Sequence, residues 1–227
     1  MKTILITGAN RGIGNAIAKK FLENNWQVIG TVRDSNKETN LDSYDNFQKE
    51  ELEVSDFNSM DNLVAKLSNQ PIDILFNNAG VMDASSMSES IYSTEKQLSD
   101  VYLINTIAPY ILAEKLISNL NKGSENLVVS MSSLLSKTKN MLALHWVYGS
   151  SKSALNYAMN AFSQNYPSIK SALVRPGWVQ TDMGGEQAPM TKEESAEIIF
   201  NNIINHKSKL ADGTMVGPEG DITYFDK

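Results

Sequence analysis

Short apolar runs rich in β-branched residues recur along this chain of 227 residues, and segments with helical periodicity separate them. The runs are TILIT (3–7), QVIGTV (27–32), DILFN (73–77), NLVVSM (126–131) and SALVR (171–175). An apolar run of this length without polar alternation is typical of a strand that is buried on both faces. Strands that alternate with helices predict an α/β fold, with a doubly wound, mostly parallel sheet of the Rossmann type and helices on both faces.

Apolar residues at helical spacing place the expected helices between these strands. The stripes are Ile13, Ile17 and Phe21; Met60, Leu63, Val64 and Leu67; Leu103, Ile107, Ile111 and Leu116; and Leu155, Met159 and Phe162. A weaker strand is expected around Leu52 to Val54, and a last strand near Thr214 to Val216. Because no long linker rich in proline or glycine divides the chain, residues 1–227 are expected to form a single dinucleotide-binding domain.

The composition argues against several classes of site and partner. A formal net charge of -6 without a basic run argues against binding to nucleic acid or to an anionic membrane surface. The absence of cysteine excludes disulfides, thiolate nucleophiles and cysteine-ligated metals. The two histidines, His145 and His206, are far apart in the sequence, so no metal site is expected. With neither a signal peptide nor an apolar run that could span a bilayer, a cytoplasmic protein is expected.

A glycine-rich turn joins the first expected strand to the first expected helix. The sequence TGANRGIG contains Gly8, Gly12 and Gly14. Glycines at such a junction let backbone amides and the helix N-terminus approach a pyrophosphate, and the third glycine lets the helix pack closely on the strand. The turn therefore predicts a site for a dinucleotide.

Tyr148 and Lys152 lie one helical turn apart in HWVYGSSKSAL, at the start of the helix expected after the strand 126–131. Two other pairs repeat the spacing, Tyr92 with Lys96 and Tyr166 with Lys170. Tyr166 is followed by Pro167, which disfavours a continuing helix there, and Tyr92 comes before the crossover helix. Only Tyr148 and Lys152 continue an apolar stripe, so both are expected at the carboxyl edge of the sheet, where α/β folds bind ligands.

Four motifs in order resemble those of the short-chain dehydrogenase/reductase family. They are the TGxxxGxG opening at 7–14, NNAG at 77–80, YGSSK at 148–152 and RPGWVQTDM at 175–183. The sequence of the last motif is similar to that of the bacterial, carbonyl-reductase-like branch of this family. The resemblance implies a nicotinamide-dependent oxidoreductase that acts on a small-molecule carbonyl or alcohol substrate, and it is compatible with a homodimer or homotetramer.

The end of the second expected strand bears on the choice of cofactor. In the alignment that the resemblance implies, Val32 takes the place of an acid that would hold the ribose 2′-hydroxyl of NAD(H), and Arg33 takes the place of a cation that would accept the 2′-phosphate of NADP(H). Arg11 adds a second guanidinium, and arginine forks pair well with phosphate oxygens. NADP(H) is therefore favoured over NAD(H). A shift of one residue would instead place the carboxylate of Asp34 on the ribose.

The resemblance also implies which residues bind the cofactor. They are Gly8, Asn10, Arg11, Gly12, Ile13 and Gly14 in the first turn; Arg33; Glu53 and Val54; Asn78, Ala79 and Gly80; Tyr148 and Lys152; and Pro176, Gly177, Val179 and Thr181. Glu53 occupies the place of an aspartate that lies beside the adenine in the family. The four residues from Pro176 to Thr181 are expected to cradle the nicotinamide carboxamide. Asn77 is expected to be structural.

Tyr148 is the predicted acid/base. A free tyrosine has a pKa of about 10, and a nearby ammonium together with oxidised nicotinamide is expected to lower that pKa. Tyr148 would then protonate the developing alkoxide in reduction and remove the proton in oxidation. Lys152 supplies the positive field and, as the resemblance implies, holds the nicotinamide ribose.

The resemblance completes the catalytic set with Ser133, which polarises the carbonyl, and with Asn105 on the crossover helix, which positions a water linked to the lysine. Ser132 is the alternative serine. An apolar wall on the substrate side is expected from a further group of residues. This group is Leu142, His145, Trp146, Trp178 and Met183.

Two other functions are compatible with the same scaffold. A non-catalytic NADP(H)-sensing protein is expected to have lost the tyrosine, lysine or serine, and this chain keeps all three. Nucleotide-sugar epimerases and dehydratases have a TGxxGxxG motif near the N-terminus and a larger C-terminal substrate domain. This chain has neither feature. Because fold alone does not imply function, the prediction of an oxidoreductase depends on the assembled site.

Overall fold

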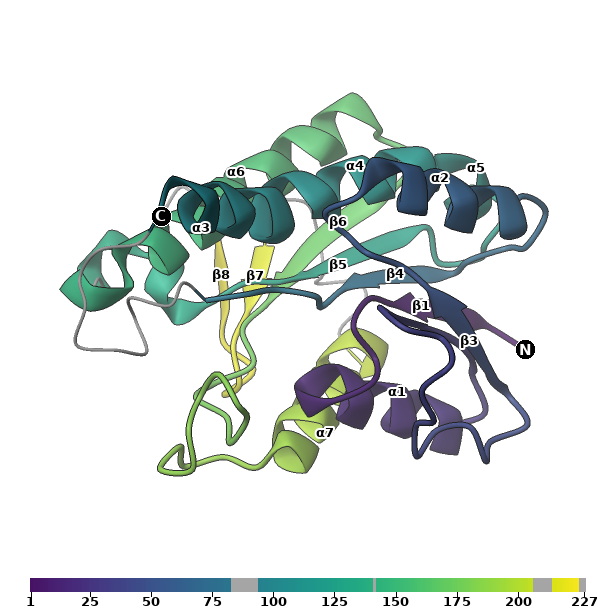
Figure 1. Ribbon diagram of the computed structural model, residues 1–227, viewed down its shortest axis with the longest axis horizontal. Helices are drawn as coiled ribbons and strands as arrows, with labels where there is room; N and C mark the ends of the chain where they lie inside the picture. Colours follow the sequence, from purple (N-terminus) through teal and green to yellow (C-terminus); the bar gives the residue numbers. More distant parts are fainter. Residues whose placement is uncertain (83–93, 141, 206–213, 225–227) are drawn as a thin grey trace.

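A computed structural model describes residues 1–82, 94–140, 142–205 and 214–224. Its centre is one eight-stranded sheet with the order β3-β2-β1-β4-β5-β6-β7-β8. All neighbouring strands pair in parallel except β8, which runs antiparallel to β7. The predicted doubly wound, mostly parallel fold is confirmed (Figure 1).

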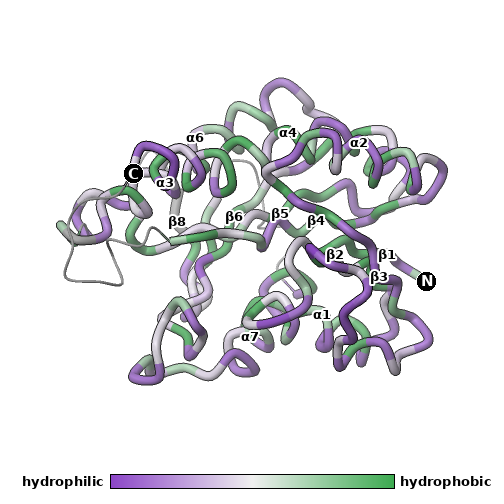
Figure 2. The backbone as a smooth tube through the Cα atoms, in the orientation of Figure 1, coloured by the Kyte–Doolittle hydropathy of each residue, from purple (hydrophilic) through white to green (hydrophobic). Residues whose placement is uncertain are grey.

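The strands are short and mostly buried, as expected for a sheet covered on both faces. They are β1 (Thr3–Ile6), β2 (Gln27–Val32), β3 (Phe47–Glu51), β4 (Ile74–Asn77), β5 (Leu127–Met131), β6 (Lys170–Val174), β7 (Thr214–Val216) and β8 (Ile222–Tyr224). Hydrophobic colouring follows the central strands in Figure 2. Strand β7 confirms the last predicted strand, whereas β8 was not predicted.

Helices cover both faces of this sheet. On one face lie α1 (Gly12–Glu23) and α7 (Lys192–Asn205), and on the other lie α2 (Phe57–Lys66), α4 (Ala108–Lys115), α5 (Ile117–Leu120) and α6 (Trp146–Asn165) (Figure 1). Helix α3 (Glu95–Tyr102) continues into α4 through a π-helical segment at Leu103–Ile107. Three short 3-10 helices, Leu134–Ser136, Thr138–Asn140 and Ala143–His145, connect β5 to α6.

Alternate residues of each strand enter two separate cores. Ile4 and Ile6 pack in the core beneath α1 and α7, whereas Leu5 packs in the core beneath α2, α4 and α6. This division follows from the period of two along a strand. Each buried strand therefore needs apolar residues at every position, which is why the runs in the sequence are continuous.

The prediction of a weaker strand at Leu52–Val54 was wrong in its position. The strand is β3, at Phe47–Glu51, and it pairs only with β2 at the edge of the sheet. Its sequence FQKEE is only half-buried, because one edge of this strand has no neighbouring strand. Strand β3 therefore contains no continuous apolar run that would identify it in the sequence, since charged residues are usual on edge strands.

Two reciprocal hydrogen bonds fix the start of α7. The Thr191 amide donates to the Glu194 carboxylate (2.8 Å), and the Glu194 amide donates to the Thr191 hydroxyl (3.2 Å), which is a capping box.

Among the described residues, no helix is both long and apolar enough to cross a membrane.

Candidate active site

Strands β1, β4, β5 and β6 end at one edge of the sheet, and each of the four sequence motifs follows one of these ends or lies on the helix just after it. Parallel strands bring their carboxyl ends together, and ligands of open α/β sheets bind beside them. The candidate site therefore lies along this edge, with the glycine turn at one end and the start of α6 at the other.

The glycine turn has the backbone conformation that a close approach to phosphate needs. Gly8 and Gly12 have φ angles of +71° and +59°, in the left-handed region that favours glycine. A Cβ at Gly14 would collide with the side chain of Asn78 and with the carbonyl of Gly8. Arg11, at the N-cap of α1, has a side chain with no hydrogen-bond acceptor, so the N–H groups of the first turn are not capped by it. The backbone thus fits a bound pyrophosphate.

The remaining residues of this turn differ in exposure. Asn10 is exposed, and Ile13 is half-buried against the core beneath α1. The NNAG motif is bonded to the turn: the Thr7 hydroxyl accepts the amides of Asn78 and Ala79, both at 3.0 Å. These bonds hold the ends of β1 and β4 in one arrangement.

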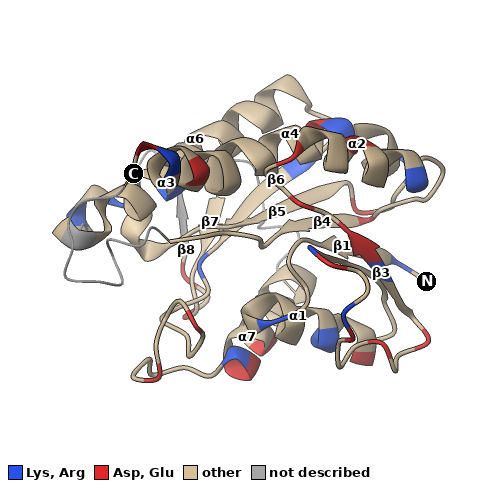
Figure 3. Ribbon diagram, viewed as in Figure 1, with Lys and Arg blue, Asp and Glu red and all other residues tan. Residues whose placement is uncertain are grey.

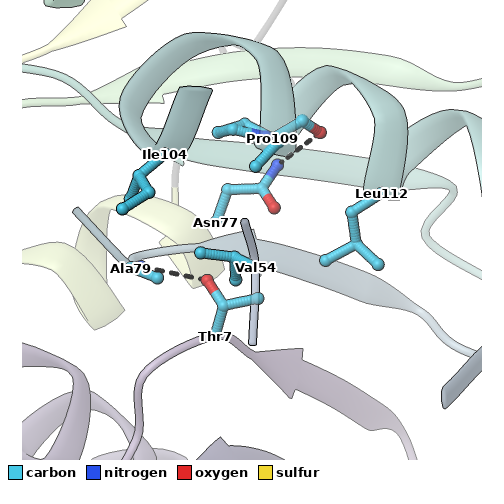
Figure 4. Close-up of a pocket in the computed structure, with 8 residues that line it drawn as sticks. Thr7, Val54, Asn77, Ala79, Ile104, Pro109 and Leu112 are labelled. Atoms are coloured by element: carbon cyan, nitrogen blue, oxygen red, sulfur yellow. Dashed lines mark hydrogen bonds between the residues drawn. The ribbon is translucent and has the colours of Figure 1, made fainter. Parts of the chain in front are cut away.

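Asn77 anchors the inner side of the motif. It is 4% exposed, and its Nδ2 donates to the Pro109 carbonyl (3.3 Å) and the Ser130 hydroxyl (3.2 Å). A cavity of about 10 Å³ lies beside it (Figure 4). The cavity is lined by Thr7, Val54, Asn77, Ala79, Ile104, Ala108, Pro109 and Leu112. The cavity has room for about one water molecule, so it is a packing gap rather than a substrate pocket.

The charged residues near the end of β2 and in the glycine turn differ in their contacts. Arg33 is exposed, and none of the described residues forms a hydrogen bond or ion pair with its side chain. The Asp34 carboxylate accepts the amide of Asn36 (3.1 Å) and lies 3.7 Å from the Lys37 ammonium. Arg11 forms an ion pair with Asp182, in the loop after β6, which sequence reasoning did not predict.

Glu53 and Val54 follow β3 at the same edge. The Glu53 carboxylate accepts the amide (3.1 Å) and the hydroxyl (2.8 Å) of Ser55, so it caps the turn before α2. Val54 is half-buried against the core beneath α2. In this arrangement the local turn already uses the Glu53 carboxylate.

Tyr148 and Lys152 lie in the first two turns of α6 and face the sheet. Their exposed fractions are 9% and 3%. The Lys152 Nζ lies 5.7 Å from the centre of the Tyr148 ring and donates to the Met131 carbonyl (2.9 Å) at the end of β5. Lys152 is the one charged residue of this 20-residue helix, and Figure 3 shows most of α6 without charge. A lone buried ammonium on an otherwise uncharged helix points to a functional role.

Burial controls the protonation of this pair. It raises the pKa of Tyr148 to about 12, and a hydrogen bond with the Ser133 hydroxyl only partly opposes the shift. Burial also lowers the pKa of Lys152 to about 8. This direction is opposite to the lowering predicted for a tyrosine beside an ammonium and an oxidised nicotinamide, because burial removes hydration from the phenolate.

The two candidate serines have different surroundings. The Ser133 hydroxyl lies close enough to the Tyr148 phenol to lower its pKa, and it accepts the amide of Leu135 (3.1 Å). The Ser132 hydroxyl is fully buried and donates to the Asn156 side chain at 2.6 Å. Only Ser133 therefore lies beside the phenol.

Asn105 lies within the π-helical segment and is fully buried. Its Oδ1 accepts the Val81 amide (2.9 Å), and its Nδ2 donates to the Val81 carbonyl (2.8 Å) and to the Ser151 hydroxyl (3.0 Å). A Cβ at Gly80 would lie 3.2 Å from the Asn105 Oδ1 and 3.5 Å from the Lys152 Nζ. Gly80, Asn105 and Lys152 therefore lie close together, and a side chain at position 80 would be in tight contact with the Asn105 amide oxygen.

Ser151 was not singled out from the sequence. Its hydroxyl is buried, accepts from Asn105 and donates to the Tyr148 carbonyl (2.7 Å). It thus connects the π-helical segment to the first turn of α6. Its position inside the YGSSK motif was the signal in the sequence that could have identified it.

The loop after β6 forms the other side of the site. Pro176 is half-buried, and Gly177 has a φ angle of +85°. Val179 is 3% exposed, and the methyl group of Thr181 lies 3.8 Å from the position of a Cβ on Gly12. The loop therefore lies directly over the glycine turn.

Exposed apolar side chains gather in the segments that flank these residues. Leu142, Trp146, Trp178 and Met183 are exposed by 53%, 54%, 57% and 37%. Leu134, directly after Ser133, is 49% exposed and was not predicted. His145 is half-buried, and its Nδ1 is buried without a hydrogen-bond partner among the described residues.

The other tyrosine–lysine pairs lie elsewhere. Tyr92 is outside the described residues, as is His206, and Lys96 lies inside α3, where its Nζ donates to Asp100 (2.8 Å). Tyr166 ends α6, as predicted from the following proline, and its hydroxyl donates to Glu114. Within the described residues, no group of three or more His, Asp or Glu side chains is arranged to hold a metal ion.

Comparison with known proteins agrees with this geometry. The model of the short chain dehydrogenase family matches residues 2–192. An uncharacterized oxidoreductase of Emericella nidulans is 29% identical, over 96% of this chain and 88% of its own. A 3-oxoacyl-(acyl-carrier-protein) reductase of Buchnera aphidicola is also 29% identical, over 94% of this chain and 88% of its own.

Two solved structures are similar over 99% of this chain. One is a short-chain dehydrogenase/reductase of Burkholderia multivorans with bound NADP, with a TM-score of 0.88, 29% identity and 99% of its own chain covered. The other is the carbonyl reductase Sniffer of D. melanogaster, with a TM-score of 0.87, 30% identity and complete coverage. The chain therefore belongs to the short-chain dehydrogenase family of nicotinamide-dependent oxidoreductases.

Proposed function

We propose that this protein is an NADP(H)-dependent oxidoreductase that transfers a hydride between the nicotinamide and a carbonyl or alcohol substrate, with Tyr148 as the acid/base. The observation that carries the proposal is the group of Tyr148, Ser133 and Lys152, in which the Lys152 Nζ lies 5.7 Å from the centre of the phenol ring and the Ser133 hydroxyl lies within reach of the phenol. NADPH, when bound, supplies the hydride.

The proposed roles of the three side chains follow from their contacts. The Tyr148 phenol, with a pKa of about 12, is protonated at neutral pH and is ready to donate its proton to the substrate oxygen. The Ser133 hydroxyl, beside it, donates a hydrogen bond to the same oxygen and stabilises the charge that develops there. The positive charge of Lys152 stabilises the phenolate that the proton transfer leaves behind.

The cofactor proposal is supported by the backbone and by the free cation. Gly8 and Gly12 have positive φ angles in the turn that leads into α1, and no side chain caps the N-terminus of that helix. Arg33 has no partner among the described residues, whereas Asp34 is already engaged by its own turn. A free guanidinium and an occupied carboxylate favour a 2′-phosphate over a ribose hydroxyl. The B. multivorans structure contains NADP, which supports the same preference.

The test is NADPH oxidation, followed by absorbance at about 340 nm across aldehydes, ketones, diketones and quinones. The exposed apolar side chains at Leu142, Trp146 and Trp178 favour substrates with an apolar body beside the carbonyl. Turnover of any of these classes would support the reductase. NADPH binding without turnover across the panel would favour the alternative, a non-catalytic NADP(H)-sensing protein. A single domain, a cytoplasmic location and a homodimer or homotetramer stay predictions.

The cofactor preference predicts the effect of charge reversal at Arg33. Arg33→Asp is expected to weaken NADPH binding by about tenfold or more and to change NADH binding by less than about threefold, because only NADPH carries the phosphate. The matched control is Lys96→Asp, which reverses an exposed charge on α3. Equal losses for both cofactors in the Arg33 variant would contradict the assignment of the phosphate site.

The two serines form a second matched pair. Ser133→Ala is expected to lower kcat by about a hundredfold, because it removes a hydrogen bond to the developing oxyanion. Ser132→Ala is expected to leave kcat within about threefold and to lower the free energy of unfolding by about 1 kcal/mol, because Asn156 is the one partner of its hydroxyl among the described residues. The measurements are steady-state kinetics and urea denaturation. A larger loss of kcat in the Ser132 variant would reverse the proposed roles.

A further inference from the structure

An ion pair connects the two sides of the proposed cofactor site. Arg11 in the glycine turn is paired with Asp182 in the loop after β6. The two segments are in contact nearby as well, because the Thr181 methyl group lies 3.8 Å from where a Cβ on Gly12 would be. The guanidinium that the sequence assigned to a cofactor phosphate is therefore already bound to a carboxylate.

The loop does not need the Asp182 carboxylate to keep its shape. The Gly184 amide donates to the Thr181 hydroxyl (3.0 Å), and the Gly185 amide donates to the Thr181 carbonyl (2.9 Å). The Trp178 indole donates to the Gly184 carbonyl (2.8 Å), and the Gln180 amide donates to the Met190 carbonyl (2.9 Å). Among the described residues, the Asp182 side chain pairs with Arg11 alone. Loss of this carboxylate should therefore leave the loop folded.

Arg11 and Arg33 are the two guanidiniums at this end of the site, and only Arg33 is without a described partner. A 2′-phosphate carries up to two negative charges and more acceptor oxygens than a carboxylate, so it competes for the Arg11 fork. NADH brings no such group. Any energy needed to release Arg11 from Asp182 is therefore subtracted from NADP(H) binding and not from NAD(H) binding.

We infer that Asp182 is a residue that determines cofactor specificity, because it competes with the 2′-phosphate of NADP(H) for Arg11. This inference rests on the proposed function, in that the protein must bind NADP(H). The side chains of Arg11 and Asp182 are 63% and 80% exposed. Pairs this exposed are worth little, so the competition weakens NADPH binding by about two- to fivefold.

The experiment measures NADPH and NADH dissociation constants by calorimetry for the wild type and for Asp182→Asn. The expected result is NADPH binding that is about two- to fivefold tighter in the variant, with NADH binding unchanged. Glu186→Gln is the matched control, because it removes the same charge from an exposed position of the same loop. It is expected to leave both constants unchanged. In an Arg11→Gln background, Asp182→Asn is expected to have no effect, as a double-mutant cycle requires when two residues act through each other.

Three outcomes would overturn the inference. Tighter binding of both cofactors in Asp182→Asn, or of NADPH in Glu186→Gln, would show a general effect of loop charge. If the wild type prefers NADPH and Asp182→Asn leaves the NADPH dissociation constant unchanged, the proposed role of Asp182 is wrong. The proposed function would then still stand. A wild type that does not prefer NADPH over NADH would reject the proposed cofactor, and the inference would fall with it.

Discussion

Replacement of Tyr148 by phenylalanine is expected to lower kcat by about a thousandfold, because it removes the proton donor while the buried ring remains. The ring is 9% exposed and packs at the start of α6, so phenylalanine fills the same space. NADPH binding is expected to stay within about threefold of the wild type, since the phosphate end of the site is untouched. The measurements are NADPH oxidation with the best substrate of the panel and direct titration of NADPH.

The same helix provides the control for this variant. Tyr157 is 82% exposed, and Tyr157→Phe removes a hydroxyl that lies in solvent. It is expected to leave kcat and stability unchanged. If Tyr148→Phe retained turnover close to that of the wild type, the proton would come from another group, and the proposed acid/base would be wrong. If it lost NADPH binding together with turnover, the phenol would instead act in cofactor binding.

Asp73→Ala is expected to lower the free energy of unfolding by about 3 kcal/mol, because it leaves the buried Thr3 amide without its acceptor and removes two hydrogen bonds from Ser124 to a carboxylate. Asp73 is 6% exposed and lies just before β4, at the edge of the sheet opposite the candidate site. Its carboxylate accepts the Thr3 amide (2.7 Å) and both the amide and the hydroxyl of Ser124 (2.7 Å each). It therefore ties β1 to the segment that enters β5.

The pH dependence of this contribution follows from the direction of the shift. Burial raises the pKa of Asp73, but the hydrogen bonds from Ser124 and Thr3 outweigh it and hold the pKa below its ordinary value. The folded protein thus binds this proton less readily than the unfolded chain does. The stabilisation is complete above the unfolded pKa of about 3.9 and is lost as the pH falls through the lower pKa of the folded state.

Urea denaturation at neutral pH and at acidic pH measures both effects. The difference in stability between the wild type and Asp73→Ala is expected to narrow as the pH falls below about 4. Asp45→Ala is the control, because Asp45 is an exposed carboxylate, and its loss is expected to change stability by less than about 0.5 kcal/mol. A constant difference down to the lowest pH tested would show that the carboxylate acts by filling space and not through its charge.

Most of the fold was predictable because its signals are local. Residues buried on both faces of a central strand must all be apolar, so QVIGTV identified β2 with its exact bounds. The same rule missed β3, because a half-buried edge strand such as FQKEE has no need of apolar residues. Strand β8 was missed because its place is set by antiparallel pairing with β7, which no run of three residues reveals.

The sequence alone determined the α/β fold and the glycine turn, and it predicted a role for Tyr148 and Lys152 among three equally spaced pairs. Periodicity, glycine placement and helix spacing are properties of neighbouring residues, so they can be recognised in the sequence without knowledge of distant contacts. The tertiary structure alone decided that Ser133 and not Ser132 lies against the phenol, that burial raises the pKa of Tyr148, and that Arg11 is paired with Asp182. These facts depend on the distance and hydration of groups from separate loops, which packing across the carboxyl edge of the sheet sets and sequence spacing does not.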